Sequence, residues 1–201
     1  MISKPKFKIG RRLGAGVYDK CQTPKFSSSS GKFAGPMARR PKALTEYGIQ
    51  LIEKQKIRFS YGITERQLGN YVKKASHIKG AGTAEKFYEE LEFRLDNVVY
   101  RMGLARSRRA ARQMVSHGHF IVNNNKITVP SYEVKQGDVI KVREGSKIKK
   151  IFENLAEKTK DYNPPPWVTF DVNKMEGLIL SKPKNIETFL DLNAVLEFYS
   201  R

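Results

Sequence analysis

The stretch RSRRAARQMVSHGHFIVNNNKITV, residues 106–129, decides the fold class because its periodicity changes halfway along. Up to Gly118 the pattern predicts a helix, with Ser107 as its N-cap and Gly118 as its stop. Beyond Gly118, two short alternating runs flank three asparagines, which tolerate left-handed backbone and suit a tight hairpin. VKQGDVIKVRE then predicts a turn at Gly137 and Asp138, followed by another strand. We therefore expect a small module that combines helices and strands.

The helix within this stretch separates charged from apolar residues. At about 100° per residue, one arc carries polar and basic residues and the opposite arc carries apolar ones that can dock on a core. The polar arc holds Arg108, Arg109, Arg112 and Ser116, and the apolar arc holds Ala110, Ala111 and Met114. An exposed helix usually gains from pairs of opposite charge, yet this one has no acid. We interpret the arginines as an anion-binding face; the alternative is a solubilising face.

The composition of the 201-residue chain indicates a polyanionic partner. The formal net charge is +18 and the sequence pI is about 10.0, which favours nucleic acid or an anionic membrane. No apolar run approaches the roughly 18 residues that span a bilayer. The N-terminal MISKPKFKIGRRLGAG lacks the apolar segment of a secretory signal. The single cysteine, Cys21, cannot form an internal disulfide, which fits a reducing compartment such as the cytoplasm.

Residues 1–42 carry much of the positive charge. They contain eleven lysines and arginines but one acid, Asp19, and they show little periodicity. Self-repulsion opposes collapse of such a segment until phosphates neutralise it. We therefore expect an arm that is disordered in the free protein and ordered on RNA. The alternative is a flexible solubilising tail.

Helical patterns fill residues 44–103. A first helix begins near Leu44, with an apolar edge of Tyr47, Leu51, Ile52 and Gln55. Thr64 and Gln67 predict a capping box that opens a second helix, which runs to about Lys79. Thr83 is expected to cap a third helix that continues until Gly103. Its predicted buried side is Phe87, Leu91, Leu95, Val98, Val99 and Met102.

The C-terminal quarter predicts a mixture of elements. Residues 145–162 are charged, and we expect a helix from Lys149 to Lys160. NPPPW at 163–167 predicts a rigid break, and the alternating WVTFDV predicts a strand. The final DLNAVLEFYSR is typical of a short amphipathic helix.

Catalytic and metal sites find little support. HGH at 117–119 could supply two ligands, but zinc takes about four, and Cys21 is distant in the sequence. GAG at 14–16 lacks the preceding strand and third glycine of a dinucleotide site. Asp96 in RLDN follows a buried helical stripe, where pairing with an arginine is a better explanation than catalysis. We expect no enzymatic activity, no metal and no cofactor.

Several motifs together resemble one family. RLDNVVYRMG at 94–103, SRRAARQMVSHGHFIVN at 107–123 and PSYEVKQGDVI at 130–140 resemble the S-four family of small-subunit ribosomal proteins, in its bacterial, zinc-free form. EYGIQLIEKQKIRFSYGITERQ at 46–67 is similar to the family's helical part, and the resemblance covers nearly the whole chain.

The resemblance implies an α+β fold, in which a mostly helical domain holds an inserted RNA-binding module and a small sheet. The expected parts are a basic N-terminal arm at 1–42 and a helical domain at 43–90 completed by 183–201. The S-four-type module follows at 91–144, and a charged helix and small sheet extension at 145–182.

The resemblance also implies a function. Such a protein is a structural component of the small subunit in the cytoplasm, binds 16S ribosomal RNA directly and nucleates assembly of the subunit body. It contacts ribosomal protein S five and other small-subunit proteins, and it lies near the path by which mRNA enters. It also contributes to translational accuracy and does not act at a membrane. The expected RNA-binding residues are Arg11, Arg12, Arg39, Arg40, Lys54, Arg58, Arg66, Arg94, Arg106, Ser107, Arg108, Arg109, Arg112, Gln113, His117, Asn123 and Lys126.

The chain departs from the family pattern at several positions. Many members hold zinc with four N-terminal cysteines, whereas only Cys21 is present here. A PGQHG-like segment is replaced by SGKFAGPMARRP. Phe59 and Gly69 stand where members often have arginine, so two RNA contacts are expected to be absent. Asn124 occupies the usual glycine position of the hairpin, which suits a left-handed residue.

Two other classes of protein carry a module of this kind. An RNA-modifying enzyme or tRNA synthetase with this module would need a separate catalytic domain, for which 201 residues leave no room. A free RNA-binding stress or quality-control factor is usually little more than the module. The helical segment and basic arm argue against such a factor.

Overall fold

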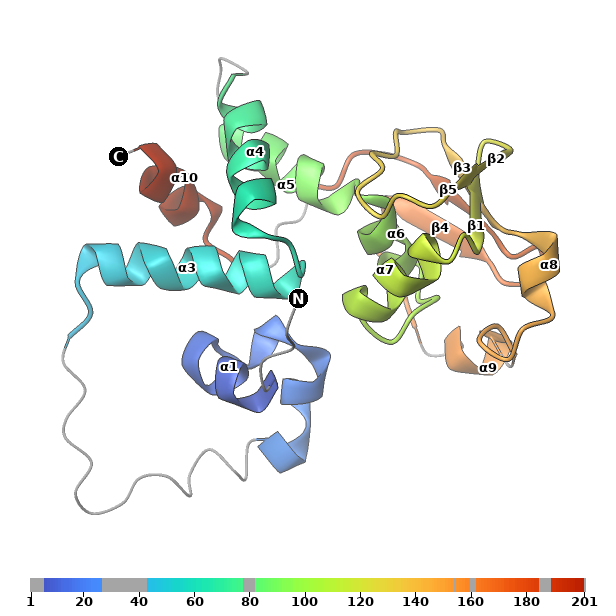
Figure 1. Ribbon diagram of the computed structural model, residues 1–201, viewed down its shortest axis with the longest axis horizontal. Coiled ribbons are helices and arrows are strands. Elements are labelled where there is room, and N and C mark those ends of the chain that lie inside the picture. Colours follow the sequence, from blue (N-terminus) through green and yellow to red (C-terminus); the bar gives the residue numbers. More distant parts are fainter. Residues whose placement is uncertain are drawn as a thin grey trace. The chain divides into compact units, whose positions relative to one another are not determined.

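The structure, a computed structural model, describes residues 6–26, 43–77, 82–153, 155–159, 162–184 and 189–200 (Figure 1). The chain forms two compact units. The first unit lies within residues 1–80 and 186–201, and the second unit within residues 81–185. Each unit buries apolar side chains of its own.

The first unit is helical. Its elements are α1 (Lys6–Leu13), the 3-10 helices η1 (Ala15–Val17) and η2 (Asp19–Gln22), α3 (Glu46–Ser60), α4 (Glu65–Ser76) and α10 (Leu192–Ser200). α10 packs against α3 although the two are far apart in the sequence (Figure 1). One link is Gln50 Nε2, which donates to a Glu197 carboxylate oxygen at 3.1 Å.

The buried side of α3 is not the apolar edge that the sequence predicted. Tyr47 is 52% exposed, whereas Lys54 and Ile57 are buried. Lys54 is accommodated because Nζ lies 2.8 Å from Glu65 and 4.2 Å from the ring centroid of Phe198 on α10. A lysine can bury its alkyl chain when its ammonium group keeps an acid and an aromatic face. The prediction was therefore wrong for Tyr47, whereas Leu51, Ile52 and Gln55 of the predicted edge are half-buried.

Residues 6–26 of the expected arm are helical in the structure, whereas disorder in the free protein and ordering on RNA stay a prediction. They form α1, η1 and η2, and they bury Leu13, Cys21 and Phe26. Gly10 permits this packing, because a Cβ there would lie 2.6 Å from the Cys21 sulfur. Cys21 is therefore part of a small core, and its burial raises the pKa of its thiol. The rest of the expected arm, residues 1–5 and 27–42, lies outside the described residues.

The second unit combines three helices with an antiparallel sheet. The helices are α5 (Thr83–Glu92), α6 (Leu95–Arg101) and α7 (Arg108–Ser116), with the short α8 (Glu144–Lys147) and α9 (Leu155–Thr159). The strands are β1 (Phe120–Val122), β2 (Asn125–Ile127), β3 (Val139–Val142), β4 (Val168–Asp171) and β5 (Glu176–Ile179). They form one sheet in the order β2-β1-β3-β5-β4, so the C-terminal strands extend the sheet of the hairpin.

Two helix predictions in this unit were wrong. The single helix expected from Thr83 to Gly103 is divided at Phe93 and Arg94, where Arg94 is extended and bridges to Glu133. This break lets the Phe93 carbonyl accept a hydrogen bond from the Val134 amide. Within the range 149–160, the described helix is only Leu155–Thr159. Residues 149–153 form turns instead, and these turns place Phe152 in the core beside Leu155 of the short helix.

The turns and strands follow the sequence closely. Asn123 and Asn124 have φ values of 46° and 70°, so the hairpin uses asparagine in the left-handed region as expected. Gly137 has φ 88° in the predicted second turn. The capping box is confirmed, because Thr64 accepts from the Gln67 amide while the Gln67 side chain accepts from the Thr64 amide.

Candidate nucleic-acid interface

α7 is held in place by its ends and its apolar side. The Ser107 hydroxyl accepts a hydrogen bond from the Ala110 amide at 3.3 Å, which confirms the predicted N-cap. Gly118 follows the helix with φ 68°, as a left-handed stop. Ala111, Met114 and Val115 are buried in the core of the second unit. The helix is therefore fixed before any ligand binds.

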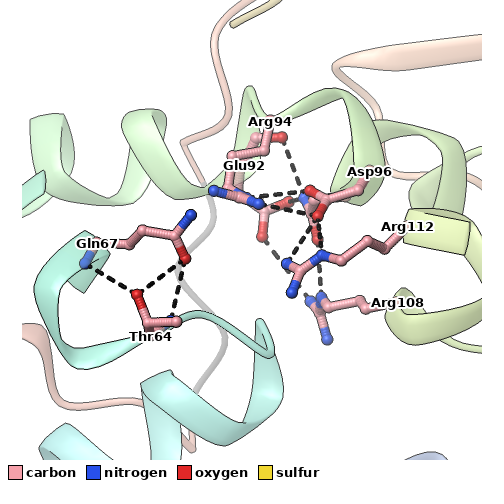
Figure 2. A network of polar contacts seen from close by, with 8 residues as sticks. Thr64, Gln67, Glu92, Arg94, Asp96, Arg108 and Arg112 are labelled. Atoms are coloured by element: carbon pink, nitrogen blue, oxygen red, sulfur yellow. Dashed lines mark hydrogen bonds and ion pairs between the residues drawn. The ribbon is translucent and has the colours of Figure 1, made fainter. Parts of the chain in front are cut away.

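Asp96, at the start of α6, pairs with two arginines (Figure 2). Arg94 donates from Nε and Nη2 to its two oxygens at 3.0 and 2.9 Å. Arg112 of α7 donates from Nε at 2.8 Å, and its Nη2 lies 2.7 Å from the same Asp96 oxygen. The expected pairing of Asp96 with an arginine is confirmed. Asp96 also fixes the direction of Arg112.

Glu92, the last residue of α5, is the second buried acid and has no exposed surface. Arg101 donates to both of its oxygens at 2.8 Å. Arg108 Nη2 lies 4.0 Å from Glu92, and Arg108 Nε donates to Asn97 Oδ1 at 2.7 Å. The Asn97 amide group in turn donates to Glu92 at 3.0 Å. Arg108 is thus oriented both by Glu92 and through Asn97. Figure 2 shows Arg108 and Arg112 turned toward the side of the network that holds Glu92 and Asp96.

These contacts define an arginine cluster in which Arg94, Arg101, Arg108 and Arg112 share Glu92 and Asp96. The four guanidinium groups outnumber the two carboxylates, so the cluster has a formal charge of +2. Buried ions are tolerated when they are paired and hydrogen-bonded. The carboxylates therefore orient the arginines without cancelling their charge. The arrangement can present a fixed positive potential to a phosphate backbone.

The structure changes the roles of several predicted residues. Arg94 is 2% exposed and bound to Asp96, and Lys54 is 7% exposed and bound to Glu65. Both therefore have a structural role in an ion pair, and their contact with RNA stays a prediction. On the predicted anion-binding face of α7, Arg108 and Arg112 turn toward the acids of the cluster. Arg109 is exposed, and it makes no ion pair with a carboxylate of the described residues.

The other predicted residues divide between the units. In the second unit, Arg106, Gln113, His117, Asn123 and Lys126 are exposed, and Ser107 is the half-buried N-cap. Asn123 also shapes the hairpin, because its Oδ1 accepts from the Val139 amide and its Nδ2 donates to Asp138. In the first unit, Arg11, Arg12 and Arg66 are exposed and Arg58 is half-buried. Arg39 and Arg40 lie outside the described residues.

A set of cations that the sequence motifs did not indicate surrounds His119. His119 is 2% exposed, and its Nδ1 lies 2.9 Å from the Ser146 hydroxyl. Burial lowers the pKa of His119, and the charges of Lys149, His117 and Arg143 lower it further. His119 is thus a core residue, and its surroundings favour the uncharged ring. The basic residues that follow β3 in the sequence, at 143–150, could have indicated that Arg143 and Lys149 lie near each other.

Other kinds of site receive no support from the described residues. Across that part of the chain, no group of three or more histidine, cysteine and acidic side chains could hold a metal ion. Nor does any helix there have the length and apolar character to cross a bilayer.

Comparison with known proteins matches both parts of the chain. Residues 93–140 match the S4 domain, and residues 2–92 match the ribosomal protein S4/S9 N-terminal domain. Small ribosomal subunit protein uS4 of Thermosipho melanesiensis is 43% identical over 204 residues, which cover 98% of this chain and 97% of the relative. The uS4 proteins of Halothermothrix orenii and Alcanivorax borkumensis are 41% and 42% identical, with the same coverage. The chain therefore belongs to the uS4 family of bacterial-type small ribosomal subunit proteins.

Proposed function

We propose that the chain binds small-subunit (16S) ribosomal RNA with the exposed edge of the arginine cluster and the neighbouring hairpin. As a uS4 protein, the chain is a structural, non-enzymatic component of the small ribosomal subunit in the cytoplasm and binds ribosomal RNA. The proposal adds which surface of this chain does so.

The observation that carries the proposal is the excess of arginine over acid in a fixed geometry. Arg108 and Arg112 are held by buried groups, and Arg109 is exposed beside them on α7. Side chains that are already ordered lose less conformational entropy on binding. Around them, Arg106, His117 and Lys126 are exposed. Phosphate contacts of this kind position a protein on RNA and supply a large share of its affinity.

Structured RNA is a better partner than DNA for this surface. An RNA helix offers a wide, shallow minor groove that proteins contact through 2′-hydroxyls and phosphates. The basic face of α7 suits such backbone contacts. The test is the affinity for 16S ribosomal RNA measured at several salt concentrations. Log K should fall by about 0.7 to 0.9 per phosphate contact for each tenfold rise in salt. Weak, salt-independent binding would overturn the proposal.

We further propose the finer roles that the family resemblance implies. The chain is expected to nucleate assembly of the subunit body, to contact ribosomal protein S five, and to contribute to accuracy and to the path by which mRNA enters. Reconstitution of the subunit without this chain tests the first role, and cross-linking in the assembled subunit tests the protein and mRNA contacts. Sedimentation in high salt distinguishes an integral component, which stays bound, from a loosely associated factor, which is released.

A further inference from the structure

α1 and α3 of the first unit line an apolar pocket with a volume of about 630 Å³. Ile9 and Leu13 line it from α1, and Leu51, Ile52 and Phe59 line it from α3. The apolar edge that the sequence predicted for α3 therefore lies in part along this pocket. The pocket is large enough for a flat heterocyclic ligand, which would remove this apolar surface from water.

The pocket is also basic. Lys8 and Arg12 of α1 and Arg58 of α3 contribute to its lining, and no acidic side chain is among the described residues that line it. An apolar floor with cations beside it suits a ligand that joins a flat, weakly polar ring to an anionic group. A nucleotide has this combination. A neutral apolar peptide would bring no anionic group to Lys8 and Arg12, whereas Arg58 already lies 3.7 Å from a Glu65 carboxylate oxygen.

Arg58 is partly prepared for such a ligand. Its guanidinium carbon lies 5.3 Å from the ring centroid of Phe59, and its Nη1 donates to Gln55 at 3.0 Å. Its Nε is buried and finds no hydrogen-bond acceptor within the parts of the chain that the structure describes. A buried donor without an acceptor is costly, so a shift of the Arg58 side chain that brought this N–H to a ligand oxygen or ring nitrogen would be favourable.

We propose that this pocket accepts one unpaired nucleobase of ribosomal RNA. The base stacks on Phe59, Arg58 Nε donates to the base or its phosphate, and Lys8 and Arg12 neutralise the adjoining phosphates. A paired base cannot enter because it is stacked within its helix, so the ligand is a nucleotide from a loop, bulge or junction. This inference rests on the proposed RNA-binding function and adds a second, chemically different contact on the first unit.

The first experiment replaces the stacking ring. Phe59→Leu keeps an apolar side chain but removes the aromatic face, and it should weaken binding of the full chain to 16S ribosomal RNA by about 5-fold or more. Tyr47→Leu is the matched control, because Tyr47 is an exposed aromatic residue on the same helix and does not line the pocket. This control should bind as the wild type does. Circular dichroism checks that both variants fold.

The second experiment locates the ligand and does not depend on the fold of Phe59→Leu. A photoreactive benzoylphenylalanine at position 59 should cross-link to a single unpaired nucleotide, read as a stop in reverse transcription of the RNA. Ile52→Trp in the same chain should reduce that cross-link, since the larger side chain occupies the pocket. Cross-links to a protein, or to bases within a duplex, would overturn the assignment.

The two proposals fail in different ways. If the wild type shows salt-dependent RNA binding but Phe59→Leu and Ile52→Trp bind equally well, only the pocket assignment falls. If the wild type does not bind 16S ribosomal RNA at all, the proposed function falls and the pocket loses its ligand as well.

Discussion

The two units hold their cations differently. In the second unit, Arg108 and Arg112 are tied to Glu92 and Asp96, which have almost no exposed surface. In the first unit, Arg12 and Arg66 are exposed on helices. Arg108 and Arg112 are therefore part of the fold of the second unit as well as of its surface. The charge pattern of a sequence therefore does not by itself distinguish structural arginines from arginines that bind a ligand.

This difference predicts where substitutions damage the fold and where they damage only binding. Trp167 is the only tryptophan of the chain, it is 5% exposed, and it packs edge-on against Phe93 in the second unit. Its fluorescence therefore reports unfolding of the second unit.

The largest expected effect is that of Met114→Asp, because Met114 anchors α7 to the core with 6% of its surface exposed. Burying an unpaired carboxylate is so costly that the second unit should fail to fold. The tryptophan emission should then resemble that of the unfolded chain without denaturant. Met114→Leu conserves volume and should cost less than about 1.5 kcal/mol. A native emission spectrum for Met114→Asp would show that α7 is not anchored as described.

The next effect is that of Asp96→Asn, which leaves Arg94 buried without its carboxylate. Removing one member of a buried ion pair typically costs about 3–5 kcal/mol. Urea unfolding followed at Trp167 measures the change in the free energy of unfolding. Glu144→Gln is the matched control, because that side chain is 85% exposed in its pair with Lys147 and should change stability by no more than about 1 kcal/mol. Equal effects of the two substitutions would contradict the contrast between buried and exposed ion pairs.

The order of elements in the second unit was predictable because its signals are local. Ser107 and Gly118 bound α7, and Asn123 and Asn124 adopt the turn that their residue type allows. The break at Arg94 was not predictable, because Arg94 pairs with Glu133, about forty residues away. Local periodicity contains no information on such pairing, so the sequence predicted one continuous helix.

The candidate interface was predictable in composition but not in geometry. The absence of acids on α7 correctly marked an unusual helix, yet the acids that orient it lie on α5 and α6. Lys54 illustrates the same limit in the first unit, since its partners Glu65 and Phe198 come from α4 and α10. Only the tertiary fold shows which cations have protein partners.

Arg109→Ala and Arg112→Ala sharpen the comparison within α7. Arg109 is exposed, so Arg109→Ala should leave the free energy of unfolding within about 0.5 kcal/mol of wild type. It should weaken RNA binding by roughly 1–3 kcal/mol and reduce the salt slope by about 0.7 to 0.9. Arg112→Ala should weaken binding and also destabilise the second unit, because Asp96 loses a partner. RNA titrations at several salt concentrations, with urea unfolding alongside, measure both quantities. Identical stability of the two variants would mean that Arg112 has no structural role.

The smallest expected effects come from acid, and they should reach the two units at different pH. Burial lowers the pKa of His119 in the second unit below its ordinary value of 6.5, so the folded state favours the neutral ring. Below pH 6.5 the unfolded chain binds the proton more readily, and the second unit should lose stability until the pH reaches the folded pKa of His119. His119→Gln removes this titration while keeping a side chain that can hydrogen-bond to Ser146, and it should flatten the pH dependence in that window.

In the first unit, burial opposes ionisation of Glu65, but hydrogen bonds from Lys54 and Tyr199 hold its pKa below 4.5. Its contribution is therefore present above pH 4.5 and is lost only as the pH falls from there through the folded pKa. Hydrogen exchange measured between pH 7 and pH 4 should show opening of the second unit first. Earlier opening of the first unit, or an unchanged pH profile in His119→Gln, would contradict the assignment of His119 as the acid-sensitive group.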